Sequence, residues 1–190
     1  MPARIVVLAS GGGTTLQAIL DDAELGPRVV AVGSDKPACT ALERARTAGV
    51  DAFAVPFADY ADRSAWNRDL EKAIAAHDPD LLVLAGFMRI LDTGIVSRFR
   101  VVNTHPALLP AFPGAHALRD ALAAGATTTG VTVHWVDEGV DTGPAIAQIE
   151  VAVEPGDDED TLRARVQAAE KPLYVQTLKI LCAELRETSR

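Results

Sequence analysis

The residues best suited to chemistry are Asn103 and His105, in the run Asn103-Thr104-His105-Pro106. On an extended segment, residues two apart project to the same side, so the Asn103 amide and the His105 imidazole are expected to share one space. An amide NH₂ beside a titratable imidazole suits the stabilisation of an oxyanion together with the transfer of a proton. The alternative is a polar pair that satisfies nearby backbone groups, but the proline-rich loop that follows favours a rigidly held pair.

Asp141, which precedes a Thr-Gly-Pro sequence, is a candidate partner for His105. A carboxylate close to that imidazole would favour its cationic form, which makes a proton donor available near neutral pH. The sequence alone does not show that the two side chains meet, and an ordinary turn aspartate is the alternative. His134, within the apolar run 131–136, is interpreted as a structural histidine rather than a catalytic one.

A second candidate site is the triple glycine at 11–13, between an apolar run and a helical pattern. Backbone N–H groups at such a helix start favour a phosphate, and Thr14 and Thr15 add hydroxyl donors. A tight turn that only lets strand and helix pack is the alternative. No lysine follows, which excludes a Walker loop, and Leu16 stands where a dinucleotide fingerprint needs glycine. Asp35 could still hold a ribose, so a dinucleotide site stays open.

The elements that position these residues follow from the apolar runs. Strands are expected near 5–9, 29–32, 50–56, 81–85, 101–104, 131–136 and 145–151, with helices near 16–20, 41–48, 61–77, 116–124 and 161–185. Strands that alternate with helices predict an α/β fold, with a mostly parallel, twisted sheet of about seven strands and helices on both faces. We expect a single domain over residues 1–190 that ends in the long helix.

Composition limits the partners. The 190 residues carry a net charge of −8, with no basic run, which makes nucleic acid an unlikely partner. No apolar stretch approaches the ~20 residues of a membrane span, and the N-terminus lacks the pattern of a signal peptide, so a cytoplasmic location without membrane contact is expected. Cys39 and Cys182 are far apart and are interpreted as reduced thiols, and no clustered ligands predict a metal site.

Taken together, these segments resemble the folate-dependent glycinamide ribonucleotide formyltransferases over residues 5 to about 174. The resemblance is carried, in order, by VVLASGGGTTLQAIL, SDK with LERARTAGV, LAGFMRIL, VVNTHPALLPAFPG, GVTVHWVDEGVDTGP and RVQAAEKPLY. It implies a Rossmann-like formyltransferase fold and formyl transfer from 10-formyltetrahydrofolate to the amine of 5′-phosphoribosylglycinamide, a step of de novo purine synthesis. The implied partners are these small molecules, no metal is implied, and a homodimer is compatible with the family.

The resemblance also assigns roles to residues of this chain. Asn103, His105 and Asp141 match the catalytic trio, in which the first two stabilise the oxyanion and Asp141 sustains the charge on His105 and assists proton relay. The ribonucleotide positions are Gly11, Gly12, Gly13, Thr14, Thr15, Gly86, Pro106 and Glu170, the last of which holds the ribose hydroxyls. The folate positions are Arg63, Met88, Arg89, Ile90, Leu91, Val136, Asp137, Glu138, Gly139 and Val140, together with Asn103 and Asp141.

The chain departs from the family pattern at four positions. Gly12 and Thr15 replace asparagines, which removes two side chains that could contact phosphate but leaves the backbone contacts possible. Leu118 stands where many members carry a second histidine, and Asp35 replaces a frequent asparagine. None of these changes touches the trio.

Three other functions are compatible with parts of the sequence. A formyltetrahydrofolate deformylase shares the trio but normally carries an extra N-terminal domain. A methionyl-tRNA formyltransferase shares the catalytic loop but adds an RNA-binding domain for which this length and acidity leave no room. A non-catalytic nucleotide-binding module would use only the glycine loop, and that interpretation leaves the pairing of Asn103 with His105 unexplained.

Overall fold

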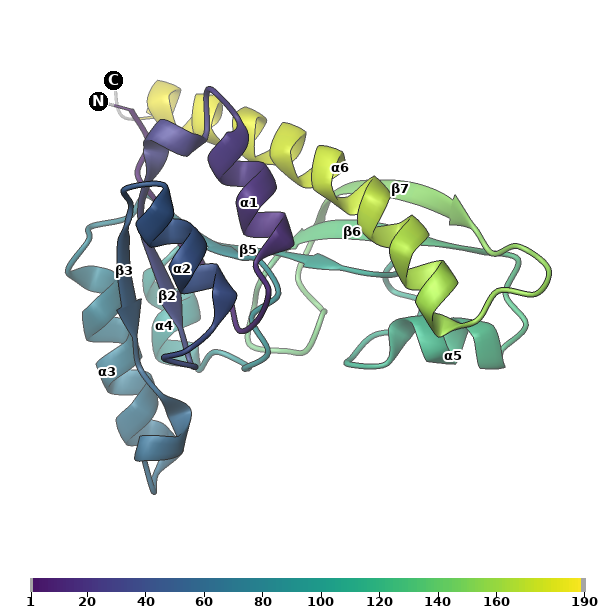
Figure 1. Ribbon diagram of the computed structural model, residues 1–190, viewed down its shortest axis with the longest axis horizontal. Coiled ribbons are helices and arrows are strands. Elements are labelled where there is room, and N and C mark those ends of the chain that lie inside the picture. Colours follow the sequence, from purple (N-terminus) through teal and green to yellow (C-terminus); the bar gives the residue numbers. More distant parts are fainter. Residues whose placement is uncertain (1, 189–190) are drawn as a thin grey trace.

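The computed structural model describes residues 2–188, which form one seven-stranded sheet in the order β3-β2-β1-β4-β5-β6-β7 (Figure 1). The strands are β1 (Ile5–Leu8), β2 (Val29–Ser34), β3 (Asp51–Ala54), β4 (Leu81–Leu84), β5 (Val101–His105), β6 (Thr128–Trp135) and β7 (Ala145–Ala152). The first five are parallel, whereas β6 runs antiparallel to both β5 and β7. The expected α/β fold with a mostly parallel sheet is confirmed.

The helices are α1 (Thr14–Asp21), α2 (Thr40–Thr47), α3 (Arg63–Ala75), α4 (Thr93–Arg98), α5 (Ala117–Ala123) and α6 (Glu159–Thr188), with 3₁₀ turns η1 (Gly26–Arg28) and η2 (Phe57–Asp59). Helix α4 and both 3₁₀ turns were not predicted from the sequence. The sequence of α4, TGIVSR, is short and combines glycine with β-branched residues, which gives a weak helical signal. Its start is fixed by Asp92, whose carboxylate accepts from the Ile95 N–H at 3.1 Å.

Alternate residues of β1 divide the core between the two faces of the sheet. Ile5 and Val7 pack in a cluster with residues of α1, α2 and α6, whereas Val6 and Leu8 pack in a second cluster with residues of α3 and α4. All four side chains are fully buried. Helices therefore cover both faces, as expected, and α6 runs along the length of the molecule over the first face (Figure 1).

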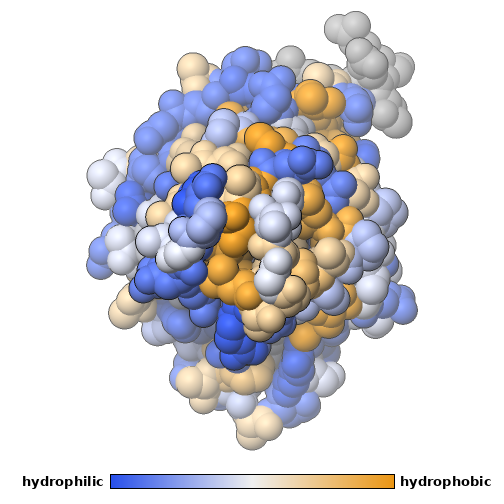
Figure 2. Space-filling model, turned by 90° about the vertical axis from the view of Figure 1, so that its right-hand side faces the viewer, coloured by the Kyte–Doolittle hydropathy of each residue, from blue (hydrophilic) through white to orange (hydrophobic). Residues whose placement is uncertain are grey.

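A third, smaller cluster lies under α5 at the end of the sheet formed by β6 and β7. It joins Leu118 of α5 and Val131 of β6 to Leu162 and Val166 of α6. Figure 2 views the molecule from this end, where apolar residues gather near the middle of the face among hydrophilic ones. No helix within residues 2–188 is long and apolar enough to cross a membrane.

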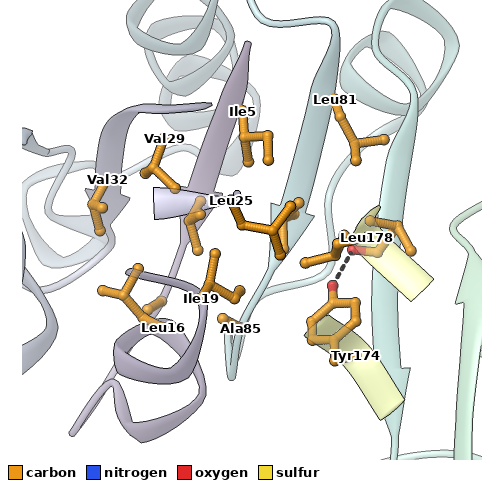
Figure 3. Packing of buried hydrophobic residues seen from close by; sticks show 14 of the residues in the cluster. Ile5, Leu16, Ile19, Leu25, Val29, Val32, Leu81, Ala85, Tyr174 and Leu178 are labelled. Atoms are coloured by element: carbon orange, nitrogen blue, oxygen red, sulfur yellow. Dashed lines mark hydrogen bonds between the residues drawn. The ribbon is translucent and has the colours of Figure 1, made fainter. Parts of the chain in front are cut away.

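Tyr174 fastens α6 to the middle of the sheet. Its fully buried hydroxyl lies 3.0 Å from both the Leu84 and the Val102 carbonyl oxygens, at β4 and β5. The ring packs beside Leu178, and Figure 3 marks one of the two hydrogen bonds with a dashed line. Because Gly86 and Asn103 follow these two carbonyls closely in the chain, the contact also fixes the strand ends that carry the candidate site.

We expect Tyr174→Phe to lower the free energy of unfolding by about 1–3 kcal/mol, because it removes the one hydroxyl proton that two buried carbonyl oxygens share. Urea denaturation measures this loss. Tyr60→Phe is a matched control, since that hydroxyl donates to Asp69 near the surface at 3.0 Å and its loss should cost clearly less. Equal costs for the two variants would contradict the role given to Tyr174.

Candidate active site

A cleft of about 650 Å³ opens where the carboxyl ends of β1, β4 and β5 meet. Between β1 and β4 the strand order reverses, because β2 lies on one side of β1 and β4 on the other. Parallel sheets bind ligands at such a switch point, in the crevice outside the carboxyl ends of the strands. The topology therefore places a ligand site between the segments that follow β1 and β4.

Most of the expected site residues line this one cleft. Its lining includes Gly11, Gly12, Gly13, Thr14, Thr15, Gly86, Met88, Arg89, Ile90, Leu91, Asn103, His105, Pro106, Val136, Asp137, Gly139, Val140, Asp141 and Glu170. Two of the expected folate positions, Arg63 and Glu138, lie outside the lining. Leu118, one of the departures from the family pattern, contributes to the cleft wall and is buried.

The glycine loop forms one wall of the cleft. Gly13 precedes α1 with a φ of +68°, and a Cβ there would lie 2.8 Å from the Ala41 Cα, so glycine is required at this position. A Cβ at Gly11 or Gly12 would meet nothing within 4 Å, which leaves the loop open to a ligand. The first N–H groups of α1 lack intrahelical partners, and the helix dipole favours an anion beside them.

Thr15 connects this wall to Glu170 of α6. The Thr15 hydroxyl donates to Glu170 Oε1 at 2.9 Å. Burial raises the pKa of the Glu170 carboxyl, and hydrogen bonds from Thr15 and Thr104 work against that rise. Glu170 is therefore a half-buried acceptor at the cleft whose charge depends on its hydroxyl neighbours.

His105 lies at the end of β5 between two acceptors. Its Nδ1 is 3.2 Å from Asp141 Oδ2, and its Nε2 is 2.7 Å from the Phe112 carbonyl oxygen. The His105 residue is only 4% exposed. Because both ring nitrogens face an acceptor, the geometry suits the doubly protonated imidazolium, which the carboxylate stabilises.

Both partners of His105 adopt a backbone conformation that side chains other than glycine rarely take. The φ angles are +52° at Phe112 and +55° at Asp141. Each such residue costs on the order of 1–3 kcal/mol, and such strain persists only where the surroundings enforce it. At Asp141 the carboxylate is held by two groups, since Oδ2 accepts from the Gly114 N–H at 2.8 Å and lies 3.2 Å from His105 Nδ1.

The Pro-rich loop that carries Phe112 is braced by β6 and β7. Thr132 donates to the Ala107 carbonyl at 2.7 Å and accepts from the Leu109 N–H at 3.0 Å. Gln148 of β7 donates to the Leu109 carbonyl at 2.9 Å and to the Thr132 hydroxyl at 2.8 Å. Side chains therefore supply the hydrogen bonds that this irregular segment cannot make within itself.

His134, interpreted from the sequence as a structural histidine, also lines the cleft. It lies on β6 directly opposite Asn103, and its Nε2 is 3.4 Å from Asn103 Nδ2 and 3.7 Å from Asp141 Oδ1. Its Nδ1 lies 2.9 Å from the Trp135 carbonyl, which makes Nδ1 the protonated nitrogen. Burial lowers the pKa of His134, so the neutral ring accepts a hydrogen bond from the Asn103 amide.

The opposite wall follows β4 and is held from behind. The Met88 N–H donates to Ser10 Oγ at 2.9 Å, and the Arg89 guanidinium donates to the buried Asp35 carboxylate at 2.8 Å. Arg63, which lies outside the lining, donates to the Ile90 carbonyl of this wall at 2.6 Å. The Asp35 carboxylate is thus paired with Arg89, an arrangement that does not favour the ribose role left open for it.

The connection between β6 and β7 covers the cleft. The connection leaves β6 at Trp135, which lies opposite Val102 and donates its backbone N–H to the Pro144 carbonyl. Asp141, in the middle of the connection, contacts His105 at the other end of β5. The connection therefore folds back along β5. Asp137 stabilises the fold-back by accepting from Thr142 Oγ1 at 2.7 Å and from the Gly139 N–H at 3.0 Å. These bonds, the first above all, lower the pKa of Asp137.

The comparisons with known proteins agree with this geometry. Residues 3–178 match the formyl transferase family model. The chain is 53% identical to the phosphoribosylglycinamide formyltransferase of Mycobacterium tuberculosis, covering 95% of this chain and 85% of the relative, and 44% identical to that of Escherichia coli, covering 90% and 83%. The crystal structure of glycinamide ribonucleotide transformylase 1 from Symbiobacterium toebii matches with a TM-score of 0.92 and 44% identity, covering 96% of this chain and 89% of that one. The chain therefore belongs to the formyl transferase family, among its phosphoribosylglycinamide formyltransferases.

Proposed function

We propose that the chain transfers the formyl group of 10-formyltetrahydrofolate to the amine of 5′-phosphoribosylglycinamide at Asn103, His105 and Asp141. The single observation that supports these roles is that all three side chains line one cleft, between the glycine loop and the segment after β4. A phosphorylated amine and a pterin enter such a cleft from different ends. The reacting groups then meet beside the trio.

The ribonucleotide occupies the end of the cleft formed by the glycine loop. Its phosphate accepts from the N–H groups of residues 11–15 at the start of α1. The Glu170 carboxylate, which also lines the cleft, accepts from the ribose hydroxyls. Gly86 and Pro106, which also line the cleft, leave room for the glycinamide arm to reach the trio.

The folate occupies the end formed by residues 88–91 and 136–141. Met88, Ile90 and Val140 are large apolar residues with 73%, 54% and 48% of their surface exposed, and a flat ring with its linker covers such surface. The backbone groups of both segments offer donors and acceptors to the pterin edge. When bound there, the folate supplies the formyl group, and the folate nitrogen that loses this group takes up a proton.

Asn103 is the direct donor to the formyl oxygen. As the substrate amine attacks, that oxygen gains negative charge, and a donor fixed beforehand stabilises it without reorganisation. His134 fixes the donor, because its unprotonated Nε2 faces the Asn103 amide nitrogen. Asn103 is half-buried, which strengthens the interaction.

His105 and Asp141 stabilise the developing charge and move the proton. The proton on His105 Nδ1 faces Asp141 in this conformation, and Asp141 lies on the connection that folds over the cleft. A shift of that connection when the cleft fills turns the proton toward the formyl oxygen. Asp141 keeps the imidazole cationic and accepts the proton that the amine loses.

Two further expectations stay predictions, a single formyltransferase domain over residues 1–190 and a cytoplasmic location. A homodimer is compatible with the family. Folate and the ribonucleotide are the proposed partners.

His105→Ala and Asp141→Asn should each lower kcat by roughly 10²–10³-fold, because each removes part of the charge stabilisation. The assay follows consumption of 10-formyltetrahydrofolate with and without the ribonucleotide. His116→Ala is the matched control, since His116 is exposed and lies outside the cleft lining. Turnover that does not need the ribonucleotide would indicate a deformylase, and near-parental rates in either variant would refute that residue's role.

His134→Ala should lower kcat by about 2–10-fold, the value of one hydrogen bond that orients Asn103. In an Asn103→Ala background the same change should cost little, because its partner is already gone. A double-mutant cycle on kcat measures this coupling, with thermal midpoints recorded to check folding. Independent, multiplicative effects of the two changes would contradict the orienting role.

Thr15→Val should shift the acid limb of the KM profile, the range in which KM for the ribonucleotide rises as pH falls, to higher pH. Protonation of Glu170 removes an acceptor, so KM for the ribonucleotide rises as pH falls through the pKa of Glu170. The Thr15 hydroxyl favours the charged carboxylate, and its removal raises that pKa further. The substrate phosphate titrates identically with both proteins, so the difference between them isolates Glu170.

The measurement is KM for the ribonucleotide against pH in the parent, Thr15→Val and Glu170→Gln. The glutamine variant should have a raised KM and no acid limb of its own. Superimposable limbs for the parent and Thr15→Val would show that the hydroxyl does not tune Glu170.

A further inference from the structure

The glycine loop is held on its outer side by α2. The Ala41 N–H donates to the Gly11 carbonyl at 3.0 Å, and Arg44 Nε donates to the Gly12 carbonyl at 2.8 Å. Gly13 packs directly against Ala41, where no Cβ would fit. Two consecutive carbonyls of the loop are therefore drawn toward the same helix.

This arrangement determines where the loop's N–H groups point. In a trans peptide the carbonyl and the N–H of the same unit point in opposite directions. The N–H groups of Gly12 and Gly13 belong to the units whose carbonyls face α2, so they point away from α2. Within the described part of the chain neither N–H donates to another group, and both glycines line the cleft.

Arg44 acts on the loop without entering the cleft. Its second contact is from Nη1 to Gln17 Oε1 of α1, at 2.9 Å, and Gln17 in turn donates to Asp21 at 2.8 Å. The Arg44 side chain lines a separate shallow depression behind the loop, of about 310 Å³, and not the cleft. One guanidinium thus ties the loop to α1 and α2 together, with the planar fork that lysine lacks.

We propose that Arg44 is a positioning residue for phosphate recognition, which sets the affinity for the phosphate monoester of the ribonucleotide by aiming the Gly12 and Gly13 N–H groups into the cleft. The proposal rests on the proposed function, and it adds the residue that orders the loop. Gly12 has no side chain, so its contribution to an anion comes from the backbone alone. The orientation of that backbone then decides the strength of binding.

Arg44→Ala should raise KM for the ribonucleotide roughly 10–100-fold, as expected for the loss of a charged hydrogen bond, with kcat and KM for the folate near parental values. Arg44→Lys keeps the charge and one donor, and should give an intermediate KM. Arg46→Ala, on the exposed side of the same helix, removes an equal charge and should leave KM unchanged. Thermal midpoints establish that each variant is folded.

A substrate without phosphate makes the test specific. With the riboside of glycinamide as acceptor, the parent and Arg44→Ala should be equally slow, because there is no phosphate for the loop to bind. Inorganic phosphate should inhibit the parent competitively and inhibit Arg44→Ala at a correspondingly higher concentration. A structural role alone would instead lower kcat and affect both acceptors alike.

Several outcomes overturn the proposal. They are an unchanged ribonucleotide KM in Arg44→Ala, an equal rise in Arg46→Ala, a parental KM in Arg44→Lys, or an equal loss with the riboside. A parent that does not transfer the formyl group to the ribonucleotide contradicts the proposed function instead. An active parent with an Arg44→Ala variant that binds phosphate normally contradicts only the role of Arg44.

Discussion

Two acceptors on opposite sides of one buried imidazole constrain a large part of this molecule. For His105 to keep both nitrogens hydrogen-bonded, the Phe112 carbonyl and the Asp141 carboxylate must each approach from a different loop. Both loops take up left-handed backbone at those residues, which costs free energy that the surrounding hydrogen bonds must offset. The bonds from Thr132 and Gln148 to the Pro-rich loop supply part of that offset on one side. The site is therefore a strained arrangement held by the last two strands.

The antiparallel strand β6 makes this arrangement possible. Its register places His134 opposite Asn103, so an accepting nitrogen lies beside the amide that donates. The connection to β7 then folds back along β5 and brings Asp141 to His105. A parallel strand at this position would need a long crossover to reach its neighbour, and that crossover would not leave a short connection over the cleft. The change from parallel to antiparallel pairing is thus a feature of the site as much as of the fold.

Local patterns predicted the parts of the site that depend on local geometry. The spacing of Asn103 and His105 predicted their common direction, and the triple glycine predicted an open loop before a helix. The role of His134 depends on strand register, which an apolar strand pattern does not reveal. The pairing of Asp35, which does not favour a ribose role, depends on Arg89, and Arg89 lies 54 residues away in the chain. The short helix α4 was missed because its propensity is weak and a single aspartate sets its start.

The charge distribution explains why the walls of the cleft are held from behind. A chain with a net charge of −8 does not attract an anionic ribonucleotide through its long-range field, so recognition has to come from short-range donors. Backbone N–H groups serve this purpose only when their direction is fixed, because a loop that reorients loses their combined dipole. Arg44 behind the glycine loop, and Asp35 behind the opposite wall through its pairing with Arg89, each fix such a segment. In the proposed reaction, the guanidinium of Arg44 therefore acts through the peptide groups it orients, and neutral backbone donors meet the phosphate of the substrate.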